Sequence, residues 1–278
     1  MYLELKNIHK SFGSGDNRTE VLRGISCGVE KGDICVLLGP SGSGKSTLLN
    51  IIGGIETADE GSIIIDGETV ENMNDKQLSL YRRKHLGYVF QSYNLIPNLT
   101  VKENIETGAY LSNDPLPLDD MLKTLGLWEH KDKIPNQLSG GQMRRVAIAG
   151  VIAMDPDYLI LDEPSAGLDP RSRDAVFAEI MALYKKRRMA VILVTHSMEE
   201  AARYSNRLLV ISGGRVILDG SPAEIYQNHK NELLAVSMDV PQLFKLSDEL
   251  RARGMEIQAD TMTAEALEAQ IKTAKGLK

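Results

Sequence analysis

Residues 34–47 read ICVLLGPSGSGKST, an apolar run followed by a glycine-rich loop and the start of a helical pattern. Residues 34–38 predict a fully buried β-strand, and residues 47–52 predict a helix. Between them, glycines let the backbone turn its N–H groups toward phosphate oxygens. Lys45 supplies a positive charge to the terminal phosphates, and Ser46 offers a hydroxyl to Mg²⁺. This loop, placed between a strand and a helix, predicts a nucleotide-binding α/β domain. The residues expected to cradle the phosphates are Gly39, Pro40, Ser41, Gly42, Ser43, Gly44, Lys45, Ser46 and Thr47.

Further apolar runs predict the rest of a sheet. Residues 158–161, 190–194 and 208–211 read as buried strands, while 3–5, 21–29, 61–67 and 86–90 read as strands bounded by turn residues. From residue 94 to about 154 the pattern is mostly helical and more polar, with breaks at Pro115, Pro117 and Pro135. This stretch predicts an inserted helical subdomain. After Asn228, two amphipathic helical stretches around residues 255–257 predict a small additional module.

Composition sets limits on function. The 278 residues, 42% of them hydrophobic, suffice for one large α/β domain with a small appendage. A net charge of −6 disfavours binding of polyanions, so no nucleic-acid partner is expected. No apolar run approaches the ~18 residues needed to cross a bilayer, and the N-terminus does not resemble a signal peptide, so a soluble, cytoplasmic chain is expected. Cys27 and Cys35 lie in or near strand-like runs and are expected to be buried thiols.

Two acidic residues end one buried strand, and a histidine follows the next. Asp162 can hold Mg²⁺ directly or through water, while Glu163 is placed to polarise the attacking water near the γ-phosphate. The alternative interpretation is that both acids are simply solvated at a strand end, but the phosphate loop upstream favours the functional role. His196 is expected to contact the γ-phosphate and orient the water, because open α/β sheets bind ligands at the carboxyl edge of their strands.

A second glycine-rich stretch, LSGGQ at residues 138–142, offers backbone N–H groups at a helix start for another anion. Gln91 follows a strand-like segment and could reach both the metal and the water. Phe12 precedes the phosphate loop, where its ring could stack on a base or simply pack in the core.

Taken together, these motifs resemble those of the ATP-binding cassette (ABC) ATPases, in family order and over residues 1 to about 230. The resemblance makes Phe12 the adenine-stacking aromatic, residues 39–47 the Walker A loop, Gln91 the Q-loop residue and residues 138–142 the signature. It makes Asp162 the Walker B acid, Glu163 the catalytic base, Asp169 part of the D-loop and His196 the switch histidine. The implied cofactors are ATP and Mg²⁺. In this family the signature of one subunit closes over the ATP of another, so Ser139, Gly140, Gly141 and Gln142 are expected to contact nucleotide across a dimer interface.

The resemblance implies an α/β P-loop NTPase (RecA-like) core with an antiparallel β subdomain, over about 1–93 and 155–230. The helical subdomain would span about 94–154, and a small C-terminal module 231–278. The expected function is that of an ATP-hydrolysing transporter subunit on the cytoplasmic face of the cell membrane. Its expected partners are a second ATPase subunit and an integral membrane subunit. The alternatives are a nucleotide-binding fusion with weak turnover and a non-transport ABC ATPase of the cell-division type.

The two parts of the chain resemble different relatives. Residues 90–105 are similar to the lipoprotein-release, macrolide-export and cell-division group, which fits everything before the signature. Residues 142–154, 163–170 and the tail from about 231 are similar to ATPase subunits of energy-coupling-factor (ECF) importers. Gly150 stands where the exporter group usually has arginine, and Ser165, Ala166 and Gly167 replace its threonine-glycine-asparagine. This division suggests a natural or engineered fusion, with one atypical natural sequence as the alternative.

Overall fold

A six-stranded sheet forms the centre of the computed structural model, which describes residues 2–71, 73–90, 92–112, 115–258 and 263–275. Its strand order is β10-β9-β3-β8-β7-β6, parallel throughout except for the edge strand β10. Strands buried on both faces of a parallel sheet read as continuous apolar runs, which is why the sequence predicted most of them. The strands are β3 (Ile34–Leu38), β6 (Leu86–Val89), β7 (Tyr158–Asp162), β8 (Ala190–Val194), β9 (Arg207–Ser212) and β10 (Arg215–Gly220).

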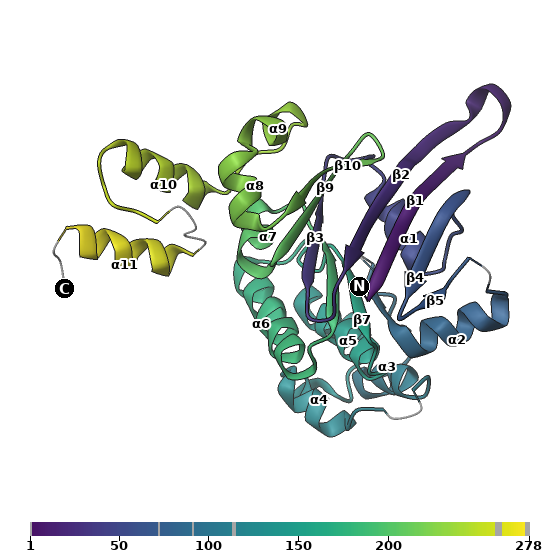
Figure 1. Ribbon diagram of the computed structural model, residues 1–278. Helices are drawn as coiled ribbons and strands as arrows, with labels where there is room; N and C mark the ends of the chain where they lie inside the picture. Colours follow the sequence, from purple (N-terminus) through teal and green to yellow (C-terminus); the bar gives the residue numbers. More distant parts are fainter. Residues whose placement is uncertain (1, 72, 91, 113–114, 259–262, 276–278) are drawn as a thin grey trace.

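A second, antiparallel sheet has the order β2-β1-β4-β5 (Figure 1). Strand β1 is much longer than the three residues predicted from the sequence. The prediction stopped at Leu5 because polar side chains interrupt the apolar pattern beyond that residue. Helix α1 (Lys45–Ile52), which follows the phosphate loop, contributes its buried leucines and isoleucines to the hydrophobic cluster that joins the two sheets. The strands are β1 (Leu3–Phe12), β2 (Thr19–Val29), β4 (Glu60–Ile65) and β5 (Glu68–Thr69).

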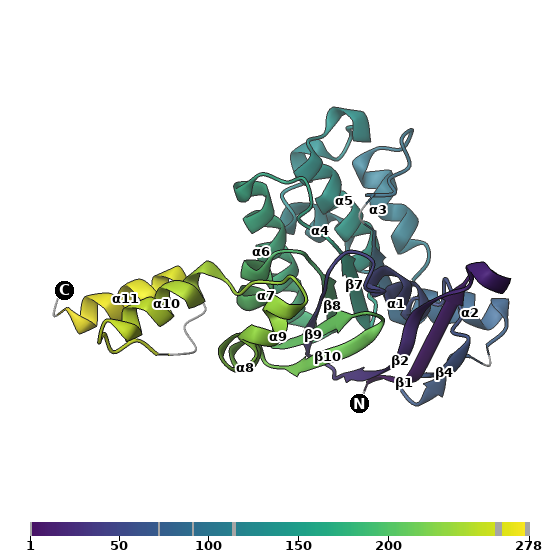
Figure 2. The ribbon, with the colours of Figure 1, turned by 90° about the horizontal axis from the view of Figure 1, so that it is seen from above.

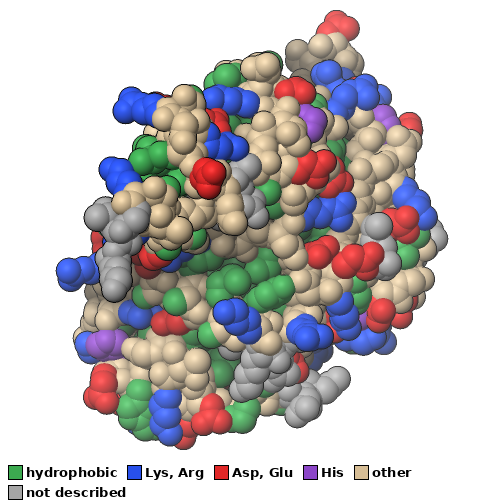
Figure 3. All heavy atoms as spheres, turned by 60° about the vertical axis from the view of Figure 1, so that its left-hand side comes forward, with side chains coloured by type: hydrophobic (Ala, Val, Ile, Leu, Met, Phe, Trp, Pro, Cys, Tyr) green, Lys and Arg blue, Asp and Glu red, His purple; other side chains and the backbone are tan. Residues whose placement is uncertain are grey.

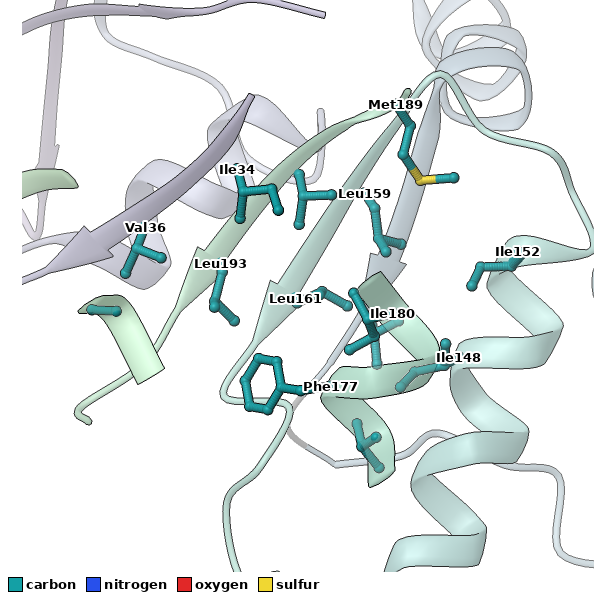
Figure 4. Packing of buried hydrophobic residues seen from close by; sticks show 14 of the residues in the cluster. Ile34, Val36, Ile148, Ile152, Leu159, Leu161, Phe177, Ile180, Met189 and Leu193 are labelled. Atoms are coloured by element: carbon teal, nitrogen blue, oxygen red, sulfur yellow. The ribbon is translucent and has the colours of Figure 1, made fainter. Parts of the chain in front are cut away.

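Alternate residues of each central strand enter two separate hydrophobic clusters. Ile34 and Val36 of β3 join the cluster that includes the helices, while Cys35 and Leu37 join the one shared with the antiparallel sheet. Figure 4 shows the first cluster: α5 (Gly140–Ile152) and α6 (Pro170–Arg187) bring Ile148, Ile152, Phe177 and Ile180 toward Leu159, Leu161 and Leu193 of the sheet. Each such side chain contributes about 1.5–3 kcal/mol when fully buried, so this packing fixes the strands that carry the site.

The helical segment predicted from residue 94 is present as α3 (Val101–Ala109), α4 (Leu118–Thr124) and α5. It leaves the sheet after β6 and returns at β7, and these two strands pair directly with each other. Helices α3 and α5 pack closely, because a Cβ added at Gly108 would lie 1.8 Å from the carbonyl oxygen of Gly150. The helices therefore form an insertion at one edge of the sheet. The helix between β5 and β6 is α2 (Asp75–His85).

Within the described residues, helices α8 to α11 follow the last strand, and α10 and α11 extend away from the sheets (Figures 1 and 2). On the face that Figure 3 brings forward, hydrophobic side chains gather near the middle, and acidic and basic side chains are interspersed around them. Within the described ranges, no helix combines the length and apolar character that a membrane span requires. The helices after β8 are α7 (Met198–Tyr204), α8 (Pro222–Asn228), α9 (Lys230–Ala235), α10 (Gln242–Ala252) and α11 (Ala264–Ala274).

Candidate active site

The polar residues singled out in the sequence come together at the carboxyl ends of neighbouring parallel strands. Lys45 follows β3, His196 follows β8 and Glu163 follows β7, and these strands lie in the order β3-β8-β7. Val194 at the end of β8 is in register with both Leu37 and Asp162, so the three strands end at the same level. This is the edge at which open α/β sheets bind ligands. Gln91, the predicted ligand after β6, lies outside the described residues.

The phosphate loop requires glycine at specific positions. Gly39 has φ +154° and a Cβ there would lie 2.1 Å from the carbonyl oxygen of Ile211, while Gly44 has φ +103° and would meet a leucine methyl at 2.6 Å. The loop is thereby pressed against β2 and β9. Gly42, with φ +77°, has nothing within 4 Å of its missing Cβ and faces open space. A backbone in this conformation turns its N–H groups outward toward an anion.

Lys45 begins α1, and its ammonium group donates hydrogen bonds of 2.8 and 2.9 Å to the carbonyl oxygens of Gly39 and Pro40. Burial lowers the pKa of Lys45, and the negative charges of Glu163 and Asp162 oppose that change. Ser46 follows in the first helical turn and is exposed. The start of the helix therefore presents the ammonium group of Lys45 and the accessible hydroxyl of Ser46.

Glu163 and His196 form a pair across two strand ends, with 2.7 Å between Oε1 of Glu163 and Nε2 of His196. Glu163 has a left-handed backbone, with φ +47°, which is costly for a residue with a side chain. Its N–H donates to the carbonyl oxygen of Val194 at 3.0 Å, and this bond helps to hold the unusual conformation. Burial raises the pKa of the neighbouring Asp162, as does the charge of Glu163.

Two buried charged residues that the sequence analysis did not single out surround this edge. Glu200 accepts hydrogen bonds from the hydroxyls of Ser165 (2.7 Å) and Thr195 (2.6 Å), joining the loops after β7 and β8. Arg144 of α5 is fully buried and binds backbone carbonyls of both the β6 and β7 ends. Arg144 and Arg145 are adjacent in α5, and the sequence alone does not show which of the two is buried.

The predicted signature residues and Asp169 belong to the starts of two helices rather than to these strand ends. Ser139 is the N-cap of α5 and exchanges hydrogen bonds with Gln142, and Gly140 and Gly141 form the first turn. Asp169 is the N-cap of α6, where its carboxylate accepts bonds from the backbone of Arg171 and Ser172. These contacts shape two helix starts, and what either one binds in a complex stays a prediction.

Phe12 ends β1 with 43% of its surface exposed, and the ammonium group of Lys10 lies 5.3 Å from its ring centroid. The exposed ring is available for stacking, and its binding of a base stays a prediction.

These residues fit a Mg²⁺–nucleoside triphosphate. The loop provides open space at Gly42 and a cation at Lys45 for phosphates, and the adjoining strand end provides the carboxylates of Asp162 and Glu163. Oxygen donors of this kind, a hydroxyl and one or two carboxylates, suit the coordination that Mg²⁺ prefers beside phosphates.

Comparison with known proteins places the chain in a family. The family model described as "ABC transporter" matches residues 22–166. The energy-coupling factor transporter ATP-binding protein EcfA2 of Clostridioides difficile is 37% identical over 282 residues, covering 98% of this chain and 96% of that protein. The chain also matches the ABC transporter ATP-binding protein MG065 of Mycoplasma genitalium, with 40% identity over 77% of this chain, and spans 46% of the length of that relative.

Among solved structures, the dimeric post-hydrolysis state of the ATP-binding cassette MJ0796, bound to ADP and Pi, has a TM-score of 0.73 and 32% identity. The match covers 79% of this chain and 98% of that one. The predicted α/β P-loop NTPase fold is thereby confirmed. The chain belongs to the ABC transporter family and carries its ATP-binding domain, as its motifs predicted.

Proposed function

We propose that the chain binds Mg²⁺–ATP at the carboxyl edge of its central sheet and hydrolyses it to drive a membrane transporter. The observation that carries this proposal is the convergence of Lys45, Asp162, Glu163 and His196 at three adjacent strand ends, with Glu163 and His196 2.7 Å apart. Lys45 neutralises the terminal phosphates, and residues 39–47 cradle them through backbone N–H groups. The exposed ring of Phe12 stacks on the base.

Ser46, Asp162 and Gln91 would hold Mg²⁺, whose charge withdraws electrons from the phosphate oxygens when it is bound. Glu163 accepts the proton of the attacking water. His196 holds the Glu163 carboxylate in place through its Nε2, and we expect its ring to contact the γ-phosphate as well. The hydrogen bond from the Glu163 N–H to Val194 fixes the base relative to β8, so the two catalytic side chains keep their mutual geometry.

We propose that each complete site needs two chains. A second helix start has N–H groups that can bind an anion, and it is formed by Ser139, Gly140, Gly141 and Gln142. The cluster of Lys45 and Glu163 does not include these residues, so they are free to serve the nucleotide of another chain. The dimeric arrangement named for the relative MJ0796 supports a second ATPase subunit as the partner. Asp169, at the start of α6, would lie at the same interface. Nucleotide would then stabilise the dimer by mass action.

The second proposed partner is an integral membrane subunit, which would place the chain on the cytoplasmic face of the cell membrane. A cavity of about 250 Å³ lies between α3, α5 and the end of β6, bordered by exposed Leu111 and Ile96. Tyr110 beside it is 81% exposed, which is unusual for a large side chain and marks a surface suited to an apolar partner. A movement of the membrane subunit would be transmitted to the nucleotide site through residues 91–108, since this segment follows β6 in sequence.

We also propose that residues 1 to about 137 and residues 138–278 derive from different ABC subfamilies. The support is the sequence pattern, exporter-like in residues 90–105 and ECF-like in the signature helix, the loop after β7 and the tail. The close contact between Gly108 and Gly150 joins the two parts, so any fusion has to preserve it. We propose the same organisation as above for the domains: an ABC ATPase domain over 1–230, its helical subdomain over about 94–154, and a C-terminal module over 231–278.

Binding to purified membrane subunits tests the partner and the fusion together. The chain should recognise an exporter or lipoprotein-release type membrane subunit at least as well as an ECF type one, because residues 91–108 form the docking segment. Exclusive, stoichiometric binding to the ECF transmembrane coupling protein would refute the fusion and make the chain an importer ATPase. ATP hydrolysis by the isolated chain, compared with a matched Glu163→Gln variant, tests the activity itself.

A further inference from the structure

The Arg144 guanidinium is the centre of a hydrogen-bond network within the described part of the chain. It is 0% exposed and lies in the second turn of α5, five positions after the N-cap Ser139. Its donors reach the carbonyl oxygens of Phe90 (2.6 Å), Pro164 (2.8 Å) and Glu163. A buried guanidinium is costly unless its donors are satisfied, so these acceptors hold the side chain in one position.

The acceptors belong to two segments that approach the nucleotide edge from different strands. Phe90 directly follows the last residue of β6 and directly precedes Gln91 in sequence. Glu163 and Pro164 form the loop after β7, and Glu163 carries the proposed base. The ring of Tyr93 lies 5.2 Å from the guanidinium carbon, which attaches the stretch after residue 91 to the same cation.

Both backbone polar groups of Glu163 form hydrogen bonds with other elements. Its N–H donates to the carbonyl oxygen of Val194 in β8, and its carbonyl accepts from Arg144 of α5 as well as from the N–H of Ala166 in the same loop (3.1 Å). This residue has φ +47°, and the bonds to β8 and α5 help to hold that conformation. A displacement of α5 would move the carbonyl of Glu163 while β8 keeps the N–H in place, and would rotate the side chain relative to His196.

We infer that Arg144 is a positioning residue. Through its side chain, binding of an anion at the helix start formed by residues 138–142 changes the orientation of Glu163 and the position of the segment that follows Phe90. The inference rests on the proposed function, in which a partner's nucleotide engages residues 139–142. Binding of nucleotide at residues 139–142 would then change the position of the proposed base Glu163 in the same chain, because the rigid Arg144 side chain contacts it. Lysine cannot replace it, because a single ammonium group lacks the fork that spans carbonyls of different segments.

The test compares Arg144→Lys with Arg145→Lys, the same change one residue further along α5. Nη1 of Arg145 lies 3.6 Å from Oε1 of Glu179 in α6. Among the described residues, the hydrogen bonds to the carbonyls of Glu163 and Pro164 come from Arg144 and not from Arg145. Arg144→Lys should lower kcat for ATP by about 10- to 100-fold, as expected for a misplaced catalytic group, with KM within about threefold of the parent. Arg145→Lys should keep kcat within about twofold. A kcat for Arg144→Lys within threefold of the parent, a parallel rise in KM, or an equal loss in Arg145→Lys would overturn the inference.

Amide hydrogen exchange tests the same link without turnover. In Arg144→Lys, exchange in residues 92–96 and 163–168 should accelerate by about tenfold, while β3 and β8 stay protected as in the parent. Unchanged exchange in both loops would refute the role of Arg144. If the parent chain shows no ATP hydrolysis, the proposed function fails, and the exchange measurement still decides whether Arg144 fixes the two loops.

Discussion

Replacing Glu163 with glutamine separates the proton-accepting role of this side chain from its contribution to folding. Glutamine has nearly the same shape, and its Oε1 can still accept the 2.7 Å hydrogen bond from His196. The left-handed backbone and the bond from its N–H to Val194 are unaffected by the substitution. The variant should therefore fold, while it lacks the carboxylate needed to accept a proton from water.

The expected loss follows from the chemistry of a positioned base. Such a group contributes about 10²- to 10⁴-fold to a rate, which corresponds to roughly 2.7–5.4 kcal/mol in the activation barrier. Binding of Mg²⁺–ATP should persist, because Lys45 and Ser46 are unchanged. Removing the charge of Glu163 also removes one of the causes that raise the pKa of Asp162, which favours its ionised, metal-binding form.

Phosphate release under saturating Mg²⁺–ATP measures the loss, and equilibrium binding of a fluorescent ATP analogue measures the affinity. EDTA should abolish the activity of the parent chain. Glu249→Gln, at an exposed carboxylate of α10, is the matched control and should keep the parental rate within about twofold. With ATP and Mg²⁺, light scattering of Glu163→Gln should give a mass twice that of the 30.6 kDa chain if the chain pairs with itself.

Turnover by Glu163→Gln within about threefold of the parent would refute the assignment, and His196 would become the candidate for orienting the water. A strict monomer with ATP and Mg²⁺ would instead indicate that the second subunit is a different chain.

Three other substitutions test separate parts of the account. Lys45→Ala should weaken ATP binding at least about tenfold and leave folding intact; a large fall in the melting temperature without nucleotide would identify a structural lysine. In Gly39→Ala the new Cβ would lie 2.1 Å from the carbonyl oxygen of Ile211, so this substitution should lower the free energy of unfolding by more than about 1–3 kcal/mol. Gly42→Ala places its Cβ in open space and should lower it by only about 1 kcal/mol. Equal losses in urea unfolding would contradict the loop geometry. Burial raises the pKa of Glu179 from 4.5 to about 7, so the folded chain holds a proton that the unfolded chain releases in this window, and stability should fall as pH rises through it, by up to about 3 kcal/mol. Glu179→Gln should flatten that pH dependence, and an unchanged slope between pH 5 and 8 would exclude Glu179 as its source.

The central strands and the phosphate loop could be predicted because each has a local cause. Residues 34–38 and 190–194 are apolar throughout, as strands covered on both faces must be, and both are strands in the structure. The glycines of the loop show in sequence because other residues adopt their positive-φ conformations only at a cost in free energy. The length of β1 and the edge strand β10 were not predicted, because alternating exposure and polar residues weaken the apolar signal at sheet edges.

The site could be predicted only as a set of motifs. That Asp162 and Val194 end in register depends on strand order, which local sequence does not encode. Arg144 binds carbonyls that lie 20 and 54 residues away in sequence, and Glu200 binds Ser165, which lies 35 residues away. Because these contacts are distant in sequence, neither role has a local signature. Subfamily differences at Gly150 and Ser165 are visible in sequence, yet their consequence would depend on the membrane subunit that we propose to dock beside α3 and α5.

The most direct test of the central claim is an experimental structure of the Glu163→Gln chain with Mg²⁺–ATP. The account predicts the γ-phosphate within hydrogen-bond distance of the Lys45 ammonium group, Mg²⁺ beside Ser46 and Asp162, and Ser139 of a second subunit against the same γ-phosphate. Triphosphate bound away from Lys45, or a nucleotide whose γ-phosphate meets no signature residue of another subunit, would contradict it.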